Sequence, residues 1–78
     1  MQTKVPLPKL AETTDTIVVE EWLVAEGDVV AAGQPIAAME TDKAVVEVMS
    51  PVTGTLTQIL VPVGEEATTG DDICVVEH

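Results

Sequence analysis

Short apolar stretches alternate with turn residues along the whole chain. Val, Ile and Thr dominate these stretches, and side chains branched at Cβ favour strands over helices. Glycine and proline recur between them at short intervals, as at Gly33, Pro51 and Gly54. The pattern predicts strands at residues 3–7, 16–24, 29–30, 36–40, 44–49, 55–59, 66–67 and 73–76. We therefore expect an all-β sandwich or barrel.

One of these stretches departs from simple alternation. Ile17, Val18 and Val19 form a continuous apolar run inside the predicted strand 16–24. Either a β-bulge or burial of both faces of the strand would account for the run, and the sequence leaves both explanations open.

The chain also repeats itself weakly with a shift of 37 residues. The shift places Gly27 on Gly64 and Gly33 on Gly70, so the two glycine pairs keep the same internal spacing. Because glycine is favoured where the backbone needs a positive φ, matched glycines imply matched turns. Two such halves, packed face to face, would form a sandwich of about eight strands with pseudo-twofold symmetry. Chance matching in a chain rich in Val and Gly is the alternative.

A hairpin is predicted between the two halves. Residues 36–40 and 44–48 are each apolar apart from one glutamate, and Thr41, Asp42 and Lys43 connect them. Asp suits a tight turn because its carboxylate can accept hydrogen bonds from nearby backbone N–H groups. We therefore expect Lys43 to project from a protruding tip.

Length and composition limit the fold to one small domain, covering residues 1–78. A chain of this size buries only about 60% of the surface exposed by its unfolded form. Cys74 is the only cysteine and His78 the only histidine, which excludes an intramolecular disulfide and a four-ligand zinc site within the chain. We predict no metal site, and stability must come from apolar burial.

The charge balance is strongly acidic. Fourteen Asp and Glu residues face three Lys and no Arg, which gives a formal charge of −11. Affinity for nucleic acids and for anionic membranes comes from clustered basic residues, so neither partner is expected. No apolar run approaches a transmembrane length of roughly 18 residues, and no signal-peptide pattern is present at the N-terminus. We therefore expect a soluble, intracellular domain.

The candidate catalytic residues have simpler structural explanations. Cys74 lies in an apolar run and is expected in the core, and His78 is expected to have no role. Adjacent acidic pairs are expected to form a solvated surface, because neighbours in a strand point to opposite faces. Trp22 is the sole aromatic residue and is expected to pack between the halves. We predict no catalytic residues.

Lys43 is the exception. From Leu10 to His78 it is the only Lys or Arg. A primary amine on a hairpin tip, supported by two strands, is a group that a modifying enzyme could acylate. The acylated side chain would then carry a tethered group, whose effective concentration is raised at sites within its reach.

The residues around Lys43 resemble the modification motif of the lipoyl domains of 2-oxo acid dehydrogenase complexes. The motif is Glu40-Thr41-Asp42-Lys43-Ala44, and the resemblance covers nearly the whole chain. The other matching segments are Leu7-Pro8-Lys9-Leu10, Trp22-Leu23 with Glu26-Gly27-Asp28, Pro51-Val52-Thr53-Gly54, and Gly64 to Gly70.

The resemblance implies a flattened barrel of two four-stranded antiparallel sheets. It also implies a non-catalytic carrier domain that is part of a dihydrolipoamide acyltransferase chain, with lipoate amide-linked to Lys43 and with Glu40, Asp42 and Ala44 as the recognition context. In the family, a thiamin-diphosphate 2-oxo acid decarboxylase acylates the lipoyl group. An acyltransferase domain then passes the acyl unit to coenzyme A, and dihydrolipoyl dehydrogenase reoxidises the dithiol.

The same resemblance implies several further properties. A lipoate-attaching enzyme is a further partner, and the isolated domain is expected to be monomeric. The expected location is the bacterial cytoplasm or, as the second choice, the mitochondrial matrix. The loop at residues 10–15 is expected to lie near the Lys43 turn and to help the decarboxylase choose this domain. Ala11 stands in that loop where many relatives have glycine.

Other functions stay open on the sequence alone. A biotinyl carrier domain of a carboxylase would share the fold, although biotinyl domains have methionine on both sides of the modified lysine, where this chain has Asp42 and Ala44. The lipoate-carrying protein of glycine cleavage is longer and has additional helices. A non-carrier acidic β-sandwich that mediates protein binding is the alternative from another class. The sequence also leaves open which 2-oxo acid complex is involved.

Overall fold

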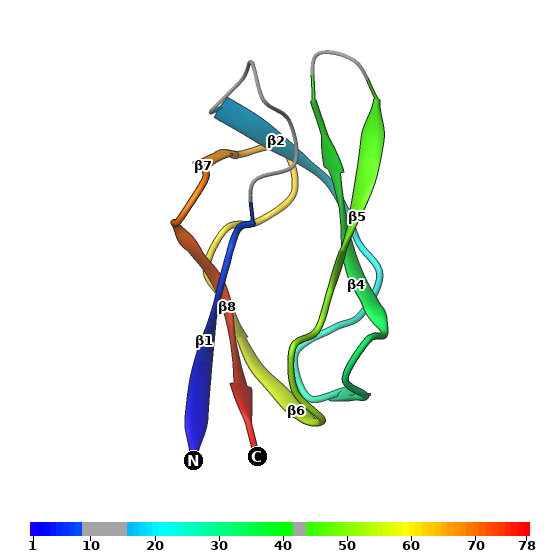
Figure 1. The fold of residues 1–78 in the computed structure, drawn as a ribbon, viewed down its shortest axis with the longest axis vertical. Helices are drawn as coiled ribbons and strands as arrows, with labels where there is room; N and C mark the ends of the chain where they lie inside the picture. The colour runs from blue at the N-terminus through cyan, green and yellow to red at the C-terminus, as the bar shows by residue number, and fades with distance from the viewer. Residues whose placement is uncertain (9–15, 42–43) are drawn as a thin grey trace.

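The computed structural model describes residues 1–8, 16–41 and 44–78, which form strands and turns (Figure 1). Each predicted strand is confirmed, and no boundary differs from its prediction by more than two residues. In the described part of the chain, no helix is long and apolar enough to cross a membrane. The strands are β1 (Gln2–Pro6), β2 (Thr16–Trp22), β3 (Val29–Val30), β4 (Pro35–Glu40), β5 (Val45–Met49), β6 (Gly54–Ile59), β7 (Glu66–Thr68) and β8 (Asp72–Glu77).

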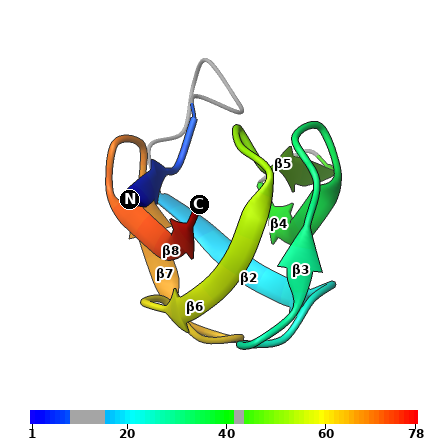
Figure 2. The ribbon, with the colours of Figure 1, turned by 90° about the horizontal axis from the view of Figure 1, so that it is seen from below.

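The strands form two four-stranded sheets with antiparallel pairing throughout. One sheet has the order β1-β8-β6-β3 and the other the order β5-β4-β2-β7. Figure 2 shows the two sheets facing one another around a common interior. The expected flattened barrel of two four-stranded sheets is therefore confirmed.

The internal repeat is visible in the sheet orders. Reading both orders in parallel matches β1 with β5, β8 with β4, β6 with β2, and β3 with β7. Each half of the chain therefore contributes two strands to each sheet, with β1 and β3 beside β6 and β8 in one sheet and β5 and β7 beside β2 and β4 in the other. This exchange ties the two halves together, because neither sheet is complete without both.

Four tight turns repeat the same hydrogen-bond pattern. Each has glycine at its third position with φ between 86° and 97°, at Gly27, Gly33, Gly64 and Gly70. In each turn the fourth residue donates its N–H to the carbonyl of the first, as Asp28 does to Ala25 at 3.0 Å. The glycine spacing in the sequence thus marks equivalent turns, as predicted, because this backbone conformation strains side chains with a Cβ.

The side chains of the apolar run in β2 alternate between the core and the outer face, and a register shift follows the run. Ile17 and Val19 are fully buried, whereas Val18 is only half-buried. The pairing of β2 with β4 shifts between Val19 and Glu21, and the pairing of β6 with β8 shifts at the equivalent place, between Leu56 and Gln58. A bulge is therefore present, but it lies just after the apolar run.

The core lies between the two sheets and is almost entirely aliphatic. Among the described residues, the one buried polar residue is Ser50, whose hydroxyl donates to the carbonyl of Val52 at 2.6 Å. Trp22 is half-buried at the margin of this core, so its predicted place between the halves is only partly correct. Its indole N–H donates to the carbonyl of Val61, in the other half, at 2.8 Å. The core residues are Val5, Leu7, Ile17, Val19, Val30, Ile36, Ala37, Met39, Val48, Leu56, Ala67, Ile73, Cys74 and Val76.

The two chain ends lie side by side, at the end of the molecule opposite the β4–β5 hairpin (Figure 1). The N–H of His78 donates to the carbonyl of Met1 at 2.7 Å, which extends the pairing of β1 with β8. The ring Nε2 of His78 lies 2.5 Å from Thr3 Oγ1. These contacts of His78 join the two ends of the chain, and the expectation that His78 has no chemical role stays a prediction.

Candidate functional site

The predicted modification hairpin is formed by β4 and β5. Their register pairs Met39 with Val46 and Glu40 with Val45. Beyond this pair, Thr41 donates its N–H to the carbonyl of Ala44 at 2.9 Å. The register therefore leaves only two residues between the closing pair Thr41 and Ala44.

Those two residues are Asp42 and Lys43, and both lie outside the described residues. The predicted role of Lys43 as the attachment site and that of Asp42 in its recognition stay predictions. The loop at residues 10–15 also lies outside the described residues, so its expected place near the hairpin stays a prediction.

Thr41 closes the hairpin with its side chain as well as its backbone. Its hydroxyl donates to the carbonyl of Ala44 at 2.8 Å and accepts the N–H of Ala44 at 3.1 Å. Sequence reasoning assigned turn hydrogen bonding to Asp42 and overlooked this residue. A threonine directly before the turn was the available signal, because Ser and Thr hydroxyls bond nearby backbone groups in turns.

The base of the hairpin is anchored in the core. On β4, Ile36, Ala37 and Met39 have no exposed surface, and on β5 Val48 is almost completely buried. β4 also lies between β5 and β2 in its sheet. Burial of these aliphatic side chains fixes the direction of the hairpin, since any tilt would expose apolar surface.

Two of the predicted recognition residues are described, and both are accessible. Glu40 is the last residue of β4 and is exposed, and Ala44 is exposed directly before β5. The structure therefore brings Glu40 and Ala44 together at the end of the hairpin, where a modifying enzyme can reach both.

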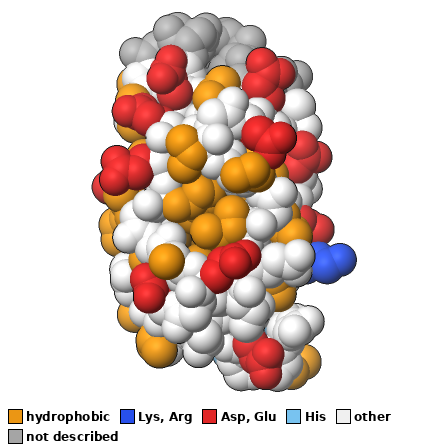
Figure 3. Space-filling view, turned by 180° about the vertical axis from the view of Figure 1, so that it is seen from behind, with side chains coloured by type: hydrophobic (Ala, Val, Ile, Leu, Met, Phe, Trp, Pro, Cys, Tyr) orange, Lys and Arg blue, Asp and Glu red, His pale blue; other side chains and the backbone are white. Residues whose placement is uncertain are grey.

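The acidic residues elsewhere serve as surface and turn residues. The predicted acidic pairs Glu20-Glu21, Glu65-Glu66 and Asp71-Asp72 are all exposed, and Figure 3 shows acidic side chains spread around an apolar area on one face. Asp71 accepts the N–H and the hydroxyl of Thr68, and these two hydrogen bonds lower the pKa of its carboxyl group. Among the described residues, no group of three or more His, Cys, Asp or Glu side chains could hold a metal ion.

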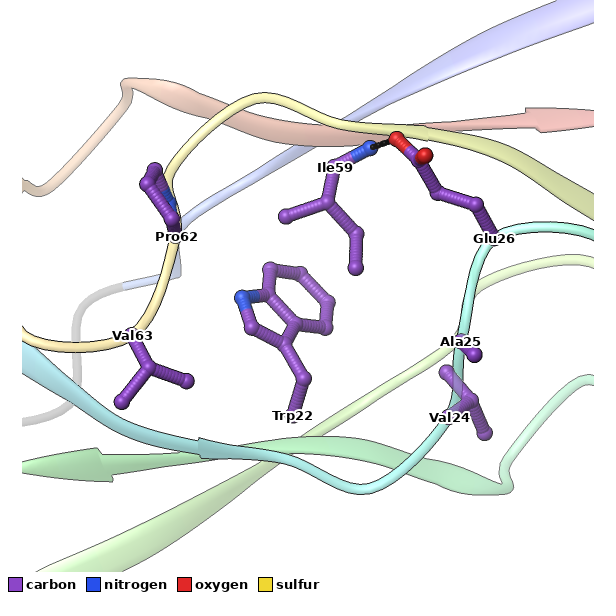
Figure 4. A pocket seen from close by; sticks show the side chains of 7 residues that line it. All are labelled: Trp22, Val24, Ala25, Glu26, Ile59, Pro62 and Val63. Carbon is purple, nitrogen blue, oxygen red and sulfur yellow. Dashed lines mark hydrogen bonds between the residues drawn. The ribbon is translucent and has the colours of Figure 1, made fainter.

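An apolar depression lies beside Trp22, away from the hairpin end. Figure 4 shows the indole ring of Trp22 reaching from β2 towards Ile59, with Pro62 and Val63 on one side. Glu26 is the only ionisable residue in its lining. Its carboxylate accepts the backbone N–H of Ile59 at 2.8 Å, which ties the 25–28 turn to β6.

Cys74 is fully buried in β8, as predicted, and it is not in a disulfide. Burial disfavours the thiolate and raises the pKa of the thiol from 9.0 to about 11. A buried thiol of raised pKa is a poor nucleophile, because the thiolate is the reactive form. This environment supports the structural role that the sequence predicted for Cys74.

We expect Cys74 in the unmodified chain to react with Ellman's reagent at pH 8 at least about a hundredfold more slowly in the native state than in guanidinium. The raised pKa also makes folding pH-dependent. Its contribution to stability is fully present below about pH 9 and is lost as the pH rises towards about 11. Urea unfolding between pH 8 and 11 measures this loss, with Cys74→Ala as the control that lacks the titrating group. Equal reaction rates in the two states would contradict the burial argument.

The chain resembles known proteins in both sequence and fold. A family model described as "Biotin-requiring enzyme", Biotin_lipoyl, matches residues 3–76. The chain belongs to the biotin/lipoyl domain family. It is therefore similar in sequence to carrier domains over nearly its whole length.

Relatives of this biotin/lipoyl domain include several acyltransferase chains. It is 39% identical over 71 residues to the lipoamide acyltransferase component of a branched-chain alpha-keto acid dehydrogenase complex from Bacillus subtilis, covering 91% of this chain. It is 42% identical over 66 residues to a dihydrolipoyllysine-residue acetyltransferase component of the pyruvate dehydrogenase complex from Zymomonas mobilis, covering 85% of this chain. The matched regions span only 17% and 15% of those proteins.

The fold of this biotin/lipoyl domain also matches a solved structure. The lipoyl domain of the 2-oxoglutarate dehydrogenase complex from Azotobacter vinelandii aligns with a TM-score of 0.77 and 24% identity. The alignment covers 96% of this chain and 95% of that domain. The likeness confirms the lipoyl-domain fold that the sequence predicted.

Proposed function

We propose that this chain is a non-catalytic lipoyl carrier domain with lipoate amide-linked to Lys43. The observation that carries the proposal is the closed hairpin, in which Thr41 and Ala44 pair with only Asp42 and Lys43 between them. The relatives of this chain include a lipoamide acyltransferase component and a dihydrolipoyllysine-residue acetyltransferase component. Both names support lipoate as the attached group.

The described residues fit a tethered group. Glu40 and Ala44 are exposed at the end of the hairpin, so no described core residue has to move to admit a modifying enzyme. When bound, lipoate supplies a dithiolane that can take up an acyl group and be reoxidised afterwards. The chain's own contribution is position, because the buried base of the hairpin fixes the two strands that lead to the attachment point.

The partners follow from this role and belong to the same proposal. They are a thiamin-diphosphate 2-oxo acid decarboxylase, an acyltransferase domain, dihydrolipoyl dehydrogenase and a lipoate-attaching enzyme. Relatives from branched-chain, pyruvate and 2-oxoglutarate complexes match this chain at 39%, 42% and 40% identity. These similar values support the whole group of complexes and favour none of them.

A biotinyl carrier domain is the competing function, because one family model covers both kinds of domain. The flanking residues Asp42 and Ala44 favour lipoate, since biotinyl domains have methionine at both positions. Because these flanking residues are what an attaching enzyme recognises, we predict that a lipoate-attaching enzyme modifies this chain and that a biotin-attaching enzyme does not.

The test is an intact-mass measurement after incubation with lipoate, ATP and a lipoate-attaching enzyme, and separately with biotin, ATP and a biotin-attaching enzyme. We expect one lipoyl-sized increment, located on Lys43 by peptide mapping, and no biotin-sized increment. Lys4 and Lys9 serve as internal controls because they are the other two lysines. A biotin increment, or a lipoyl group on Lys4 or Lys9 alone, would overturn the proposal.

A further inference from the structure

The outer edge of β5 has unpaired backbone groups within the described structure. The N–H of Thr41 donates to the carbonyl of Ala44, so the backbone of Ala44 faces β4. Because backbone groups alternate in direction along a strand, those of Val46 and Val48 also face β4. The same alternation turns the N–H and C=O groups of Val45, Glu47 and Met49 away from β4. Among the described residues no strand pairs with this side, since β5 is the edge of its sheet.

The side chains along this edge are accessible as well. Val45 and Met49 are 52% and 47% exposed, and Glu47 between them is also exposed. Because side chains two residues apart in a strand share a face, these three form one row. We call Val45, Glu47 and Met49 the β5 strip. It combines backbone donors and acceptors that no described strand pairs with, two apolar side chains and a central carboxylate.

The pseudo-equivalent edge strand shows what a protected edge looks like in this fold. The carbonyl of Met1 accepts the N–H of His78, so alternation places Gln2, Lys4 and Pro6 on the outer edge of β1. Proline has no N–H to offer, and a lysine disfavours strand addition, so both residues blunt an edge. The β5 strip has no proline, and its one charged side chain, Glu47, opposes the addition of acidic segments but can pair with a basic one. The other two edge strands, β3 and β7, are only 2 and 3 residues long.

We propose that the β5 strip is a docking edge for an extended segment of another protein, which adds as a fifth strand to the sheet. Backbone hydrogen bonds would supply affinity, and alternate side chains would supply specificity. Charge complementarity selects a segment with Lys or Arg opposite Glu47 and aliphatic residues that contact Val45 and Met49. Because β5 begins two residues after Lys43, the docked segment would run alongside the hairpin. The proposal does not depend on Lys43 being modified.

A second copy of this chain fits the strip less well. An antiparallel β5–β5 pair centred on Glu47 would place two like charges directly opposite one another, which is destabilising. Each copy also has a formal charge of −11, which opposes association over longer distances. The structure therefore favours a basic partner segment over a homodimer.

The experiment is an NMR titration of the 15N-labelled chain with a capped heptapeptide of alternating Thr and Val that has Lys at its centre. We expect the largest shift changes at the amides of β5, and slowed hydrogen exchange at the N–H groups of Val45, Glu47 and Met49. Absence of β5 changes at millimolar peptide, or largest changes elsewhere, would overturn the proposal. Concentration-dependent β5 shifts without peptide would also overturn it, in favour of a second copy.

Two variants distinguish strand addition from general attraction. Glu47→Pro removes an outward N–H and keeps the bonds to β4, so we expect about tenfold weaker binding. The matched control is Lys4→Pro at the equivalent outer-edge position of β1, which should leave the affinity unchanged. Glu47→Lys should weaken binding about threefold and should prefer a peptide with Glu at its centre. Equal loss from Lys4→Pro, or no charge preference in Glu47→Lys, would contradict docking at the β5 strip.

Discussion

A variant in which Asp42 and Lys43 exchange places, D42K/K43D, is expected to receive no lipoyl group under conditions that fully modify the parent chain. The exchange keeps composition and net charge and moves the amine by one residue. Attachment requires the amine to meet the activated carboxyl carbon at bonding distance, and small displacements of reacting groups cost large factors in rate. Adjacent residues in a strand-turn-strand segment project in different directions. We therefore expect the rate of modification to fall by at least about a hundredfold.

Intact mass as a function of time measures this effect, and the melting temperature checks the fold. The closing hydrogen bonds of the hairpin belong to Thr41 and Ala44, which the exchange leaves in place. The melting temperature should therefore stay within a few degrees of the parent value. Lys43→Arg, which keeps the charge but lacks a primary amine, is the reference for complete loss of lipoylation. Full lipoylation of D42K/K43D at the parent rate would show that position in the turn does not govern recognition.

Replacing Gly54 with alanine is expected to have the largest effect on stability of any single glycine substitution in the chain. A Cβ at this position would overlap the backbone carbonyl of Glu77 and would also come within 3.0 Å of the Cβ of His78. Gly54 begins β6, where it lies against the end of β8. Because the clash is with backbone, relief requires the strands to separate. We expect a loss of about 2–3 kcal/mol in the free energy of unfolding.

Urea and thermal unfolding measure this loss, which corresponds to a fall in melting temperature of roughly 10–20 °C for a domain of this size. Gly27→Ala is the matched control. Gly27 has φ of 97° but nothing within 4 Å of the added Cβ, so only backbone strain is introduced there. That strain is expected to cost about 1 kcal/mol. A Gly54→Ala chain as stable as the parent, or less affected than Gly27→Ala, would contradict the close-approach argument.

The strands and turns of this domain could be predicted because their signals are local. Runs of Val, Ile and Thr favour extended backbone at each position, and glycine at Gly27, Gly33, Gly64 and Gly70 marks a backbone conformation that other residues avoid. The repeat of 37 residues was visible for the same reason, since equivalent turns need equivalent glycines. The candidate site was also local, because Glu40 to Ala44 are consecutive and a hairpin needs no distant partner to bring them together.

Features that depend on contacts between distant residues could not be predicted in this way. The sequence marks Gly54 as a turn residue, but the need for glycine comes from Glu77, which is 23 positions later in the chain. The contact of His78 with Met1 joins residues at opposite ends of the chain. The bulge after Val19 is defined only by the register of β2 against β4.

The strands, the turns, the repeat and the hairpin that contains the Lys43 motif could all be predicted from the sequence, because each depends on residues that are neighbours in the chain. The three-dimensional fold was needed to show which strands form edges and which backbone groups no described strand pairs with, since strand order is set by how the two aliphatic faces pack. Gln2, Lys4 and Pro6 differ visibly from Val45, Glu47 and Met49 in the sequence. That difference bears on strand addition only because the fold places the two rows on equivalent edges of the two sheets.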